Sequence, residues 1–282
     1  MTTWFISGAS RGLGAEIARA ALRGGDDVVA TARTTDRLPA DLTASEHLLP
    51  LRLDVTDQAG APAAVDAAVE RFGRIDVLVN NAGRGLLGAI EEVSDAEARS
   101  LFDLNVFGLL ALTRAVLPVM RRQRSGTLVH IGSRSGFEGE PGVGLYSASK
   151  FAVAGISEAL AAELAPFGIQ STVVEPGVFR TDFLDASSLS LPAGRIADYD
   201  GTPAHTTLDW SSQANHTQLG DPVKGAELIR DVVRSGALPS HLYLGKDSIE
   251  RREALIERAH ADIATWRSRS VATAHDDALA SA

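Results

Sequence analysis

The sequence predicts an α/β protein, a single domain in which a doubly wound parallel sheet carries helices on both faces. Three observations support this. Short β-rich stretches alternate with longer amphipathic segments, as in consecutive strand–helix–strand units. The first strand runs directly into a glycine-rich turn, and the chain of 282 residues can bury a core without disulfides or metals.

The spacing of apolar residues places the elements in chain order. Strands are expected at residues 4–7, 28–32, 49–53, 76–80, 127–131, 170–175 and 241–244. Helices are expected at about 13–24, 61–72, 96–120, 146–165, 222–234 and 249–266. The alternation is regular enough to predict a parallel sheet whose connections are mostly helical.

Residues 182–218 break the pattern. This tract is rich in Ser, Thr, Pro, Gly and Asp, and it separates two regions that have clear strand and helix periodicity. A loop of this length inside a domain is typically a functional lid or disordered. We therefore expect a catalytic domain at 1–245 with a substrate-loop insert at 182–218. A C-terminal helix and flexible tail should follow at 246–282, fraying from about residue 268.

Composition excludes several classes of function. The chain has 27 Lys and Arg against 36 Asp and Glu, a formal net charge of −9, which argues against a nucleic-acid partner. It has no cysteine, hence no disulfide or thiol nucleophile, and its seven histidines lack metal-ligand spacing, so no metal is expected. The apolar tract 106–120 falls short of the roughly 20 residues of a membrane span. A soluble cytoplasmic protein with no membrane partner is the expectation.

A glycine-rich turn directly after the first strand predicts a dinucleotide site. Glycines permit the tight turn and the close approach of backbone to a pyrophosphate, whose charge is favoured at a helix N-terminus. The spacing, Gly-x3-Gly-x-Gly, departs from the commoner Gly-x-Gly-x-x-Gly. The turn reads Ser7-Gly8-Ala9-Ser10-Arg11-Gly12-Leu13-Gly14.

The end of the second strand predicts the choice of cofactor. An acidic residue at this position binds the adenosine ribose 2′-hydroxyl, whereas an arginine accommodates a 2′-phosphate. Here the strand ends in Ala32-Arg33, and no acid follows until Asp36. Arg33, with Arg11 closing from the glycine turn, is predicted to grip the 2′-phosphate of NADP(H) through bidentate contacts.

Further motifs follow along the chain: Asp54-Val55, Asn80-Asn81-Ala82-Gly83, Tyr146-Ser147-Ala148-Ser149-Lys150 and Pro176-Gly177. With these motifs the chain resembles the classical type of short-chain dehydrogenase/reductases, and within it the NADP-preferring subset that includes retinol and hydroxysteroid dehydrogenases. Ser7 stands where that family has threonine. The resemblance covers residues 4–181 and implies a Rossmann-type fold and a catalytic tetrad of Asn105, Ser133, Tyr146 and Lys150. Together with the turn and Arg33 it implies this cofactor-binding set: Gly8, Ser10, Arg11, Gly12, Leu13, Gly14, Arg33, Asp54, Val55, Asn81, Ala82, Gly83, Tyr146, Lys150, Pro176, Gly177, Val178 and Thr181.

The residue chemistry agrees with this assignment. Tyr146 and Lys150 lie one helical turn apart, so they share a face, and the ammonium is expected to lower the tyrosine pKa from its usual value near 10. Tyr146 would then serve as general acid/base, while Ser133 donates a hydrogen bond to the substrate oxygen. The resemblance implies that Asn105 holds a water on the proton path and that Lys150 binds the nicotinamide ribose.

The predicted function is an oxidoreductase that moves a hydride between NADP(H) and an alcohol/ketone pair. Two alternatives stay open, a non-catalytic dinucleotide sensor and a nucleotide-sugar epimerase or dehydratase. The predicted apolar lining suits a medium-sized, fairly apolar small molecule, and it comprises Phe137, Val143, Leu145, Phe183, Leu184, Leu189 and Leu191. Helices 96–120 and 146–165 resemble the pair through which family members form homodimers or homotetramers.

Overall fold

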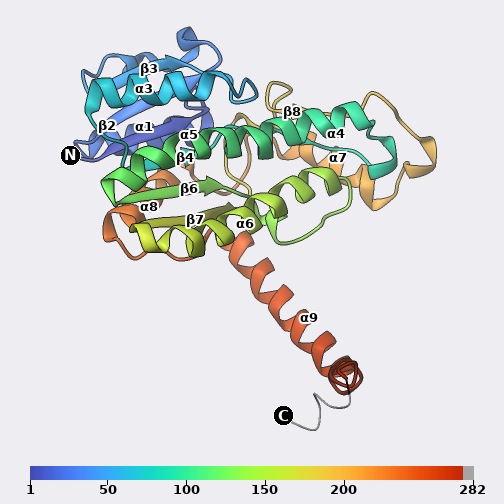
Figure 1. Cartoon of the computed structure of the whole chain (residues 1–282). Coiled ribbons are helices and arrows are strands. Elements are labelled where there is room, and N and C mark those ends of the chain that lie inside the picture. The colour runs from blue at the N-terminus through green and yellow to red at the C-terminus, as the bar shows by residue number, and fades with distance from the viewer. Residues whose placement is uncertain (276–282) are drawn as a thin grey trace.

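Seven parallel strands form the central sheet of the computed structural model, which describes residues 1–275 (Figure 1). Their order is β3-β2-β1-β4-β6-β7-β9, so the chain builds outward from β1 in one direction and then in the other. The doubly wound parallel sheet predicted from the sequence is thereby confirmed. The strands are β1 (Thr3–Ser7), β2 (Asp27–Ala32), β3 (Leu48–Arg52), β4 (Val77–Asn80), β6 (Gly126–Ile131), β7 (Ile169–Pro176) and β9 (His241–Leu244).

Helices cover both faces of this sheet. Helices α1 and α8 pack side by side on one face, and α3, α5 and α6 lie on the other. The helices are α1 (Gly12–Arg23), α2 (Ala40–Thr43), α3 (Gly60–Phe72), α4 (Asp95–Phe102), α5 (Gly108–Gln123), α6 (Gly144–Leu164), α7 (Pro203–Ala214), α8 (Pro222–Ser235) and α9 (Lys246–Val271).

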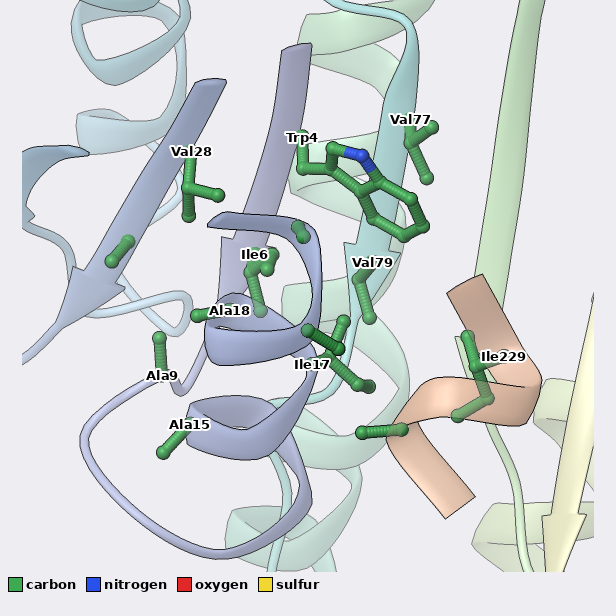
Figure 2. Close-up of a cluster of buried hydrophobic side chains, with 14 of the residues drawn as sticks. Trp4, Ile6, Ala9, Ala15, Ile17, Ala18, Val28, Val77, Val79 and Ile229 are labelled. Carbon is green, nitrogen blue, oxygen red and sulfur yellow. The ribbon is translucent and has the colours of Figure 1, made fainter. Parts of the chain in front are cut away.

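Alternating residues of the strands feed two hydrophobic cores. In β1, Trp4 and Ile6 face α1 and α8, whereas Phe5 between them belongs to the core on the opposite face. Figure 2 shows Trp4 and Ile6 packed with Ile17 of α1 and Ile229 of α8. Burial on both faces explains why these central strands read as nearly continuous apolar runs. The same packing on both faces holds the carboxyl ends of the strands in place, and the polar residues that line the cavity follow these ends.

The helix predicted at 96–120 is interrupted. It consists of α4 and α5 joined by a π-helical turn at Asp103–Phe107, and the buried Asn105 lies inside that turn. A π-turn inserts an extra residue into a helix and is common at functional sites. The apolar period could not show this interruption, because it continues through both helices.

The stretch Asp95–Gln123 is long and apolar enough to span a membrane by length and composition alone, with a mean hydropathy of 1.5 over its best window. Of that window 44% is buried within the fold, where α5 packs against α3, β4 and β6. A core helix can have the same length and composition, so these two properties by themselves are weak evidence for a membrane span.

The insert 182–218 contains more structure than predicted. It includes α7 and a short strand, β8 (Leu189–Ser190), which pairs with β5 (Gly85–Leu86). Helix α7 escaped prediction because its sequence is polar and buries only His205 and Ser211, so no apolar stripe marks it. At the other end, α9 extends past the predicted 249–266 to Val271, and residues 276–282 of the expected tail lie outside the described residues.

Candidate active site

The carboxyl ends of the central strands open into a cavity of about 870 Å³. Its walls come from the glycine turn after β1, the ends of β2, β4, β6 and β7, the start of α6 and the insert. Ligands of doubly wound sheets bind at this edge, next to the point where strand order reverses. Apart from the buried Gly14 and Asn105, the predicted site residues all line this one cavity.

The glycine turn has the shape that a pyrophosphate requires. Gly8 and Gly12 have φ of +68° and +55°, the left-handed region that favours glycine. A Cβ at Gly14 would lie 2.3 Å from the amide nitrogen of Asn81, so only glycine fits there. Helix α1 begins at Gly12 with no side-chain cap, which leaves its first N–H groups available to an anion at the cavity.

Ser7 and Asn81 hold this turn against the neighbouring strand. The Ser7 hydroxyl accepts hydrogen bonds from the backbone N–H of Asn81 and Ala82, at 3.0 and 3.1 Å. The Asn81 amide donates to the carbonyls of Ser7 and Gly8, at 2.9 and 3.0 Å. Serine therefore supplies the hydroxyl that threonine has in the resembling family, and Asn81 both lines the cavity and positions the turn.

Asp54, Val55 and Arg33 gather where β2 and β3 end. Burial raises the pKa of the Asp54 carboxyl, but hydrogen bonds from Thr56 and the charges of Arg33 and Arg52 bring the pKa below its usual value. Asp54 is therefore an ionised acceptor at this end of the cavity. Arg33 is exposed and lines the cavity, as the prediction for a 2′-phosphate requires.

Arg11 has a different set of contacts from the predicted one. Its guanidinium donates to the hydroxyl and the carbonyl of Ser187 in the insert, both at 2.7 Å. The structure therefore links Arg11 to the insert rather than directing it to a site shared with Arg33. Its predicted contact with a phosphate stays a prediction.

Tyr146 and Lys150 lie on one face of α6, and both are buried at the cavity. The Lys150 ammonium lies 5.8 Å from the centre of the Tyr146 ring and donates to the carbonyl of Ile131 at 2.7 Å. Burial raises the pKa of Tyr146 to about 12, while the neighbouring Ser133 hydroxyl and the Arg134 charge lower it in part. Burial likewise lowers the pKa of Lys150 to about 8.

The expected lowering of the Tyr146 pKa by Lys150 is therefore wrong for this structure. Desolvation disfavours both charged forms, and it is the largest cause of both shifts. At neutral pH the phenol keeps its proton and the ammonium keeps its charge. This state can donate a proton from Tyr146.

Asn105 reaches the same site from the π-turn. Its side-chain oxygen accepts from the backbone N–H of Arg84, and its amide donates to the Arg84 carbonyl and the Ser149 hydroxyl, at 3.0 to 3.1 Å. A Cβ at Gly83 would lie 3.2 Å from Asn105 and 3.7 Å from Lys150, so the two side chains flank this glycine. Asn105 thus fixes the segment after β4, and the implied water path stays a prediction.

The segment after β7 closes the cavity from the other side. Val178 donates its backbone N–H to Asp247 of α9 at 3.0 Å, and a Cβ at Gly177 would collide with the same carboxylate. The side chain of Thr181 lies near Gly12, 3.5 Å from the point where a Cβ would stand. Pro176, Gly177, Val178 and Thr181 all line the cavity as predicted.

Several cavity residues carry no motif and were missed. Gln218 is 4% exposed, and neither polar atom of its amide has a hydrogen-bond partner within residues 1–275. Of the predicted apolar lining only Val143, Phe183 and Leu184 reach the cavity, joined by Leu87 and Trp210. Phe137 packs against Tyr243 instead, and Leu191 is exposed. A buried glutamine that follows a polar tract leaves no signal in sequence.

Two further predictions concern histidines and metals. His130 is fully buried as expected for a core residue, and burial lowers its pKa to about 4.

On the insert, Asp182, Asp185 and His216 bring potential ligand atoms within 4.8 Å of one another. Exposed acidic groups often meet in this way without an ion, and the expected absence of a metal stays a prediction.

A dinucleotide cradle at a sheet edge, with a buried tyrosine–lysine pair beside it, defines an oxidoreductase that uses NAD(P). The family described as short chain dehydrogenase matches residues 2–190. The chain belongs to this family. The fungal oxidoreductase BOA17 of Botryotinia fuckeliana is 36% identical over 273 residues, 96% of this chain and 98% of its own.

Other similar proteins agree. A 3-ketodihydrosphingosine reductase of Bacteroides thetaiotaomicron is 40% identical over 194 residues, 69% of this chain and 70% of its own. A short-chain dehydrogenase from Streptomyces avermitilis superposes with a TM-score of 0.89 at 38% identity, over 97% of this chain and 100% of its own. The relatives are fungal and bacterial oxidoreductases, and they do not single out the retinol and hydroxysteroid subset.

Related crystal structures contain both forms of the cofactor. One from Burkholderia phymatum is a complex with NAD, with a TM-score of 0.80, 25% identity and coverage of 94% of each chain. Another, ElxO, has NADP bound, with a TM-score of 0.73, 26% identity and coverage of 88% of this chain and 99% of its own. The family therefore fixes a nicotinamide dinucleotide, and the choice between its two forms must be argued from residues of this chain.

Proposed function

We propose that the protein is an NADP(H)-dependent oxidoreductase that interconverts a ketone and a secondary alcohol on a medium-sized, fairly apolar molecule. Arg33 carries the cofactor choice. It lies exposed at the end of β2 beside the cavity, and no ion pair joins it to a carboxylate within residues 1–275. A planar guanidinium in this position suits a 2′-phosphate, which it can bind through two donors.

The cavity has the features that a dinucleotide needs. The left-handed glycines and the uncapped start of α1 suit the pyrophosphate, and Asp54 with Val55 suits the adenine end. Lys150 and the segment after β7 lie at the other end, where the nicotinamide ribose would be held. When bound, the cofactor supplies or accepts the hydride.

The residues of the chain provide the rest of the chemistry. In reduction, Ser133 and Tyr146 donate hydrogen bonds to the ketone oxygen and polarise the carbonyl. Tyr146 then transfers its phenolic proton to that oxygen, and the Lys150 ammonium stabilises the phenolate that forms. Because the pKa of Tyr146 is about 12, the proton donor is fully protonated at neutral pH.

The substrate end of the cavity supports an apolar substrate. Leu87, Val143, Phe183 and Trp210 line it next to Tyr146, whose ring lies 5.7 Å from that of Phe183. The relative that reduces a ketodihydrosphingosine, by its name, supports ketone reduction. The narrower resemblance to retinol and hydroxysteroid dehydrogenases contributes the same expectation of an apolar ketone or alcohol.

Cofactor binding measured by fluorescence titration, and a panel of apolar ketones followed by NADPH absorbance, test the proposal. Arg33→Ala should weaken NADPH binding roughly tenfold to several hundredfold and leave NADH binding unchanged, since NADH has no 2′-phosphate. Arg37→Ala is the matched control, because Arg37 is also exposed near β2 but does not line the cavity. A wild-type preference for NADH, or equal weakening of both cofactors, would contradict the proposal.

We also propose a cytoplasmic homo-oligomer that forms through α4–α5 and α6. Phe107 and Phe151 are 48% and 46% exposed on these elements, although both are large apolar side chains. Burial of such residues is a common feature of interfaces between copies of a chain. Light scattering that shows only monomers would contradict this part of the proposal.

A further inference from the structure

Helix α9 extends away from the rest of the protein. Figure 1 shows it projecting alone from the end of the sheet. It has 26 residues, about 39 Å at 1.5 Å per residue, and Ser248 is its only buried residue. Such a helix has almost no tertiary packing along most of its length.

The first turns of α9 are firmly attached. Ser248 donates its hydroxyl to the Glu175 carbonyl at 2.8 Å, and Arg251 pairs with Glu138. Beyond these turns, from Glu253 onward, most side chains are exposed. In proteins, most helical stability comes from tertiary packing of an apolar face rather than from helix propensity. The outer part of α9 therefore lacks the packing that usually stabilises such a helix.

An apolar seam runs along this exposed part. On this part Ile256 and Ile263 lie seven residues apart and are 44% and 51% exposed. Ile249, 44% exposed, continues the same spacing back into the attached first turns, where Arg252 takes the intermediate position. Ala259 and Trp266 follow at the intermediate positions, three residues after an isoleucine, and Trp266 is 55% exposed. Apolar residues at these two heptad positions form the seam of a coiled coil.

The charges of α9 favour a protein partner over a membrane. Its sequence holds six basic and five acidic residues, and the two signs are interspersed along the helix. Helices that lie on anionic membranes present a polar face rich in Lys and Arg. In α9, Glu253 and Arg267 flank the seam near its two ends, and neither forms an ion pair within the described residues.

We infer that α9 pairs with α9 of a second copy of the chain in an antiparallel coiled coil. In the antiparallel register, Trp266 of each copy packs against Ile256 of the other, and Ala259 packs against Ile263. Each layer thus combines a larger residue with a smaller one. The same register places Glu253 opposite Arg267 of the other copy, twice by symmetry, and such charges set partner choice and orientation. This interface is separate from the α4–α5 and α6 surface and is independent of the proposed activity.

Charge reversal in the full-length protein tests the pairing by light scattering. Arg267→Glu should halve the molar mass at a concentration where the wild type is fully paired, because two carboxylates then face each other. The double variant Glu253→Arg/Arg267→Glu should restore the wild-type mass. Arg258→Glu is the control, since it makes the same charge change away from the seam. An unchanged mass in Arg267→Glu, no restoration in the double variant, or an equal loss in the control would overturn the inference.

The absence of cysteine makes a cross-linking test of orientation clean. With a short bismaleimide, a mixture of Glu253→Cys and Arg267→Cys proteins should give a cross-linked pair, while each protein alone should not. Cross-linking of Glu253→Cys with itself would indicate a parallel arrangement and contradict the antiparallel one. Sedimentation of the wild type with phosphatidylglycerol vesicles, abolished by Ile263→Glu, would identify the seam as a lipid-binding face and overturn the inference.

Discussion

The two ends of the cavity are built in different ways. The cofactor end is held by backbone geometry, with left-handed glycines at Gly8 and Gly12 and an amide of Asn81 bonded to main-chain carbonyls. The substrate end is closed by the insert, residues 182–218, which side-chain contacts hold against the rest of the protein. Buried His205 of α7 contacts Glu92 at 2.8 Å and Asp200 at 3.0 Å. The first end is therefore held by main-chain geometry, whereas contacts between side chains hold the second.

The largest effect is expected at the junction of the two ends. Tyr146→Phe removes the proton donor but keeps the ring that packs against Phe183. Turnover should fall by about 10²- to 10⁴-fold, the usual contribution of general acid catalysis, with NADPH binding nearly unchanged. Initial rates and a fluorescence titration measure the two quantities. Activity within tenfold of wild type would be incompatible with the assigned role.

Lys150 should make the rate of ketone reduction depend strongly on pH. Its pKa is lowered to about 8, so the ammonium predominates below that pH and is lost above it. Tyr146, with a pKa of about 12, stays protonated throughout this range. Ketone reduction should therefore fall by roughly tenfold per pH unit above about 8.

The variant Lys150→Arg provides the control, because a guanidinium keeps its charge throughout this range. Its pH–rate profile should lack the descending limb near pH 8, even if its turnover is lower. A limb that persists at the same pH in this variant would assign the titration to another group.

The insert should respond to loss of its buried contact. His205→Ala removes the partner of Glu92, whose pKa the Ile196 backbone N–H and the His205 ring hold below its usual value. The KM for the ketone should rise by roughly tenfold, with a smaller change in kcat, because the wall of the substrate end loosens. Steady-state kinetics measure both constants. Ser212→Ala, on the exposed side of α7, should have neither effect, and an equal response would argue against a specific contact.

The smallest expected change is in dynamics. Amides of residues 182–218 should exchange faster than those of the sheet in the free protein and become more protected with NADPH and a ketone, as expected for a lid. Hydrogen exchange read by mass spectrometry resolves the two regions. Equal protection of the insert in the free and ternary states would show that it is a fixed wall.

The same contrast explains what could be predicted from the sequence. The glycine turn and the Tyr146–Lys150 pair follow from local rules, since a left-handed turn requires glycine and one helical turn brings two side chains together. The π-turn around Asn105, helix α7 and the contact from Arg11 to Ser187 depend on residues distant in sequence. The raised pKa of Tyr146 could not be predicted for a related reason, because burial is a property of the whole fold.

The contact between Arg11 and Ser187 has a kinetic consequence. It joins the glycine turn to the insert, and both of its residues line the cavity. We expect this contact to open when a dinucleotide enters or leaves the glycine turn, because Arg11 belongs to that turn. On the proposed function, a ketone held beneath the insert would then block the exit of the cofactor. The expected order is then that the cofactor binds first and leaves last, with the two hydrogen bonds between Arg11 and Ser187 contributing to that order.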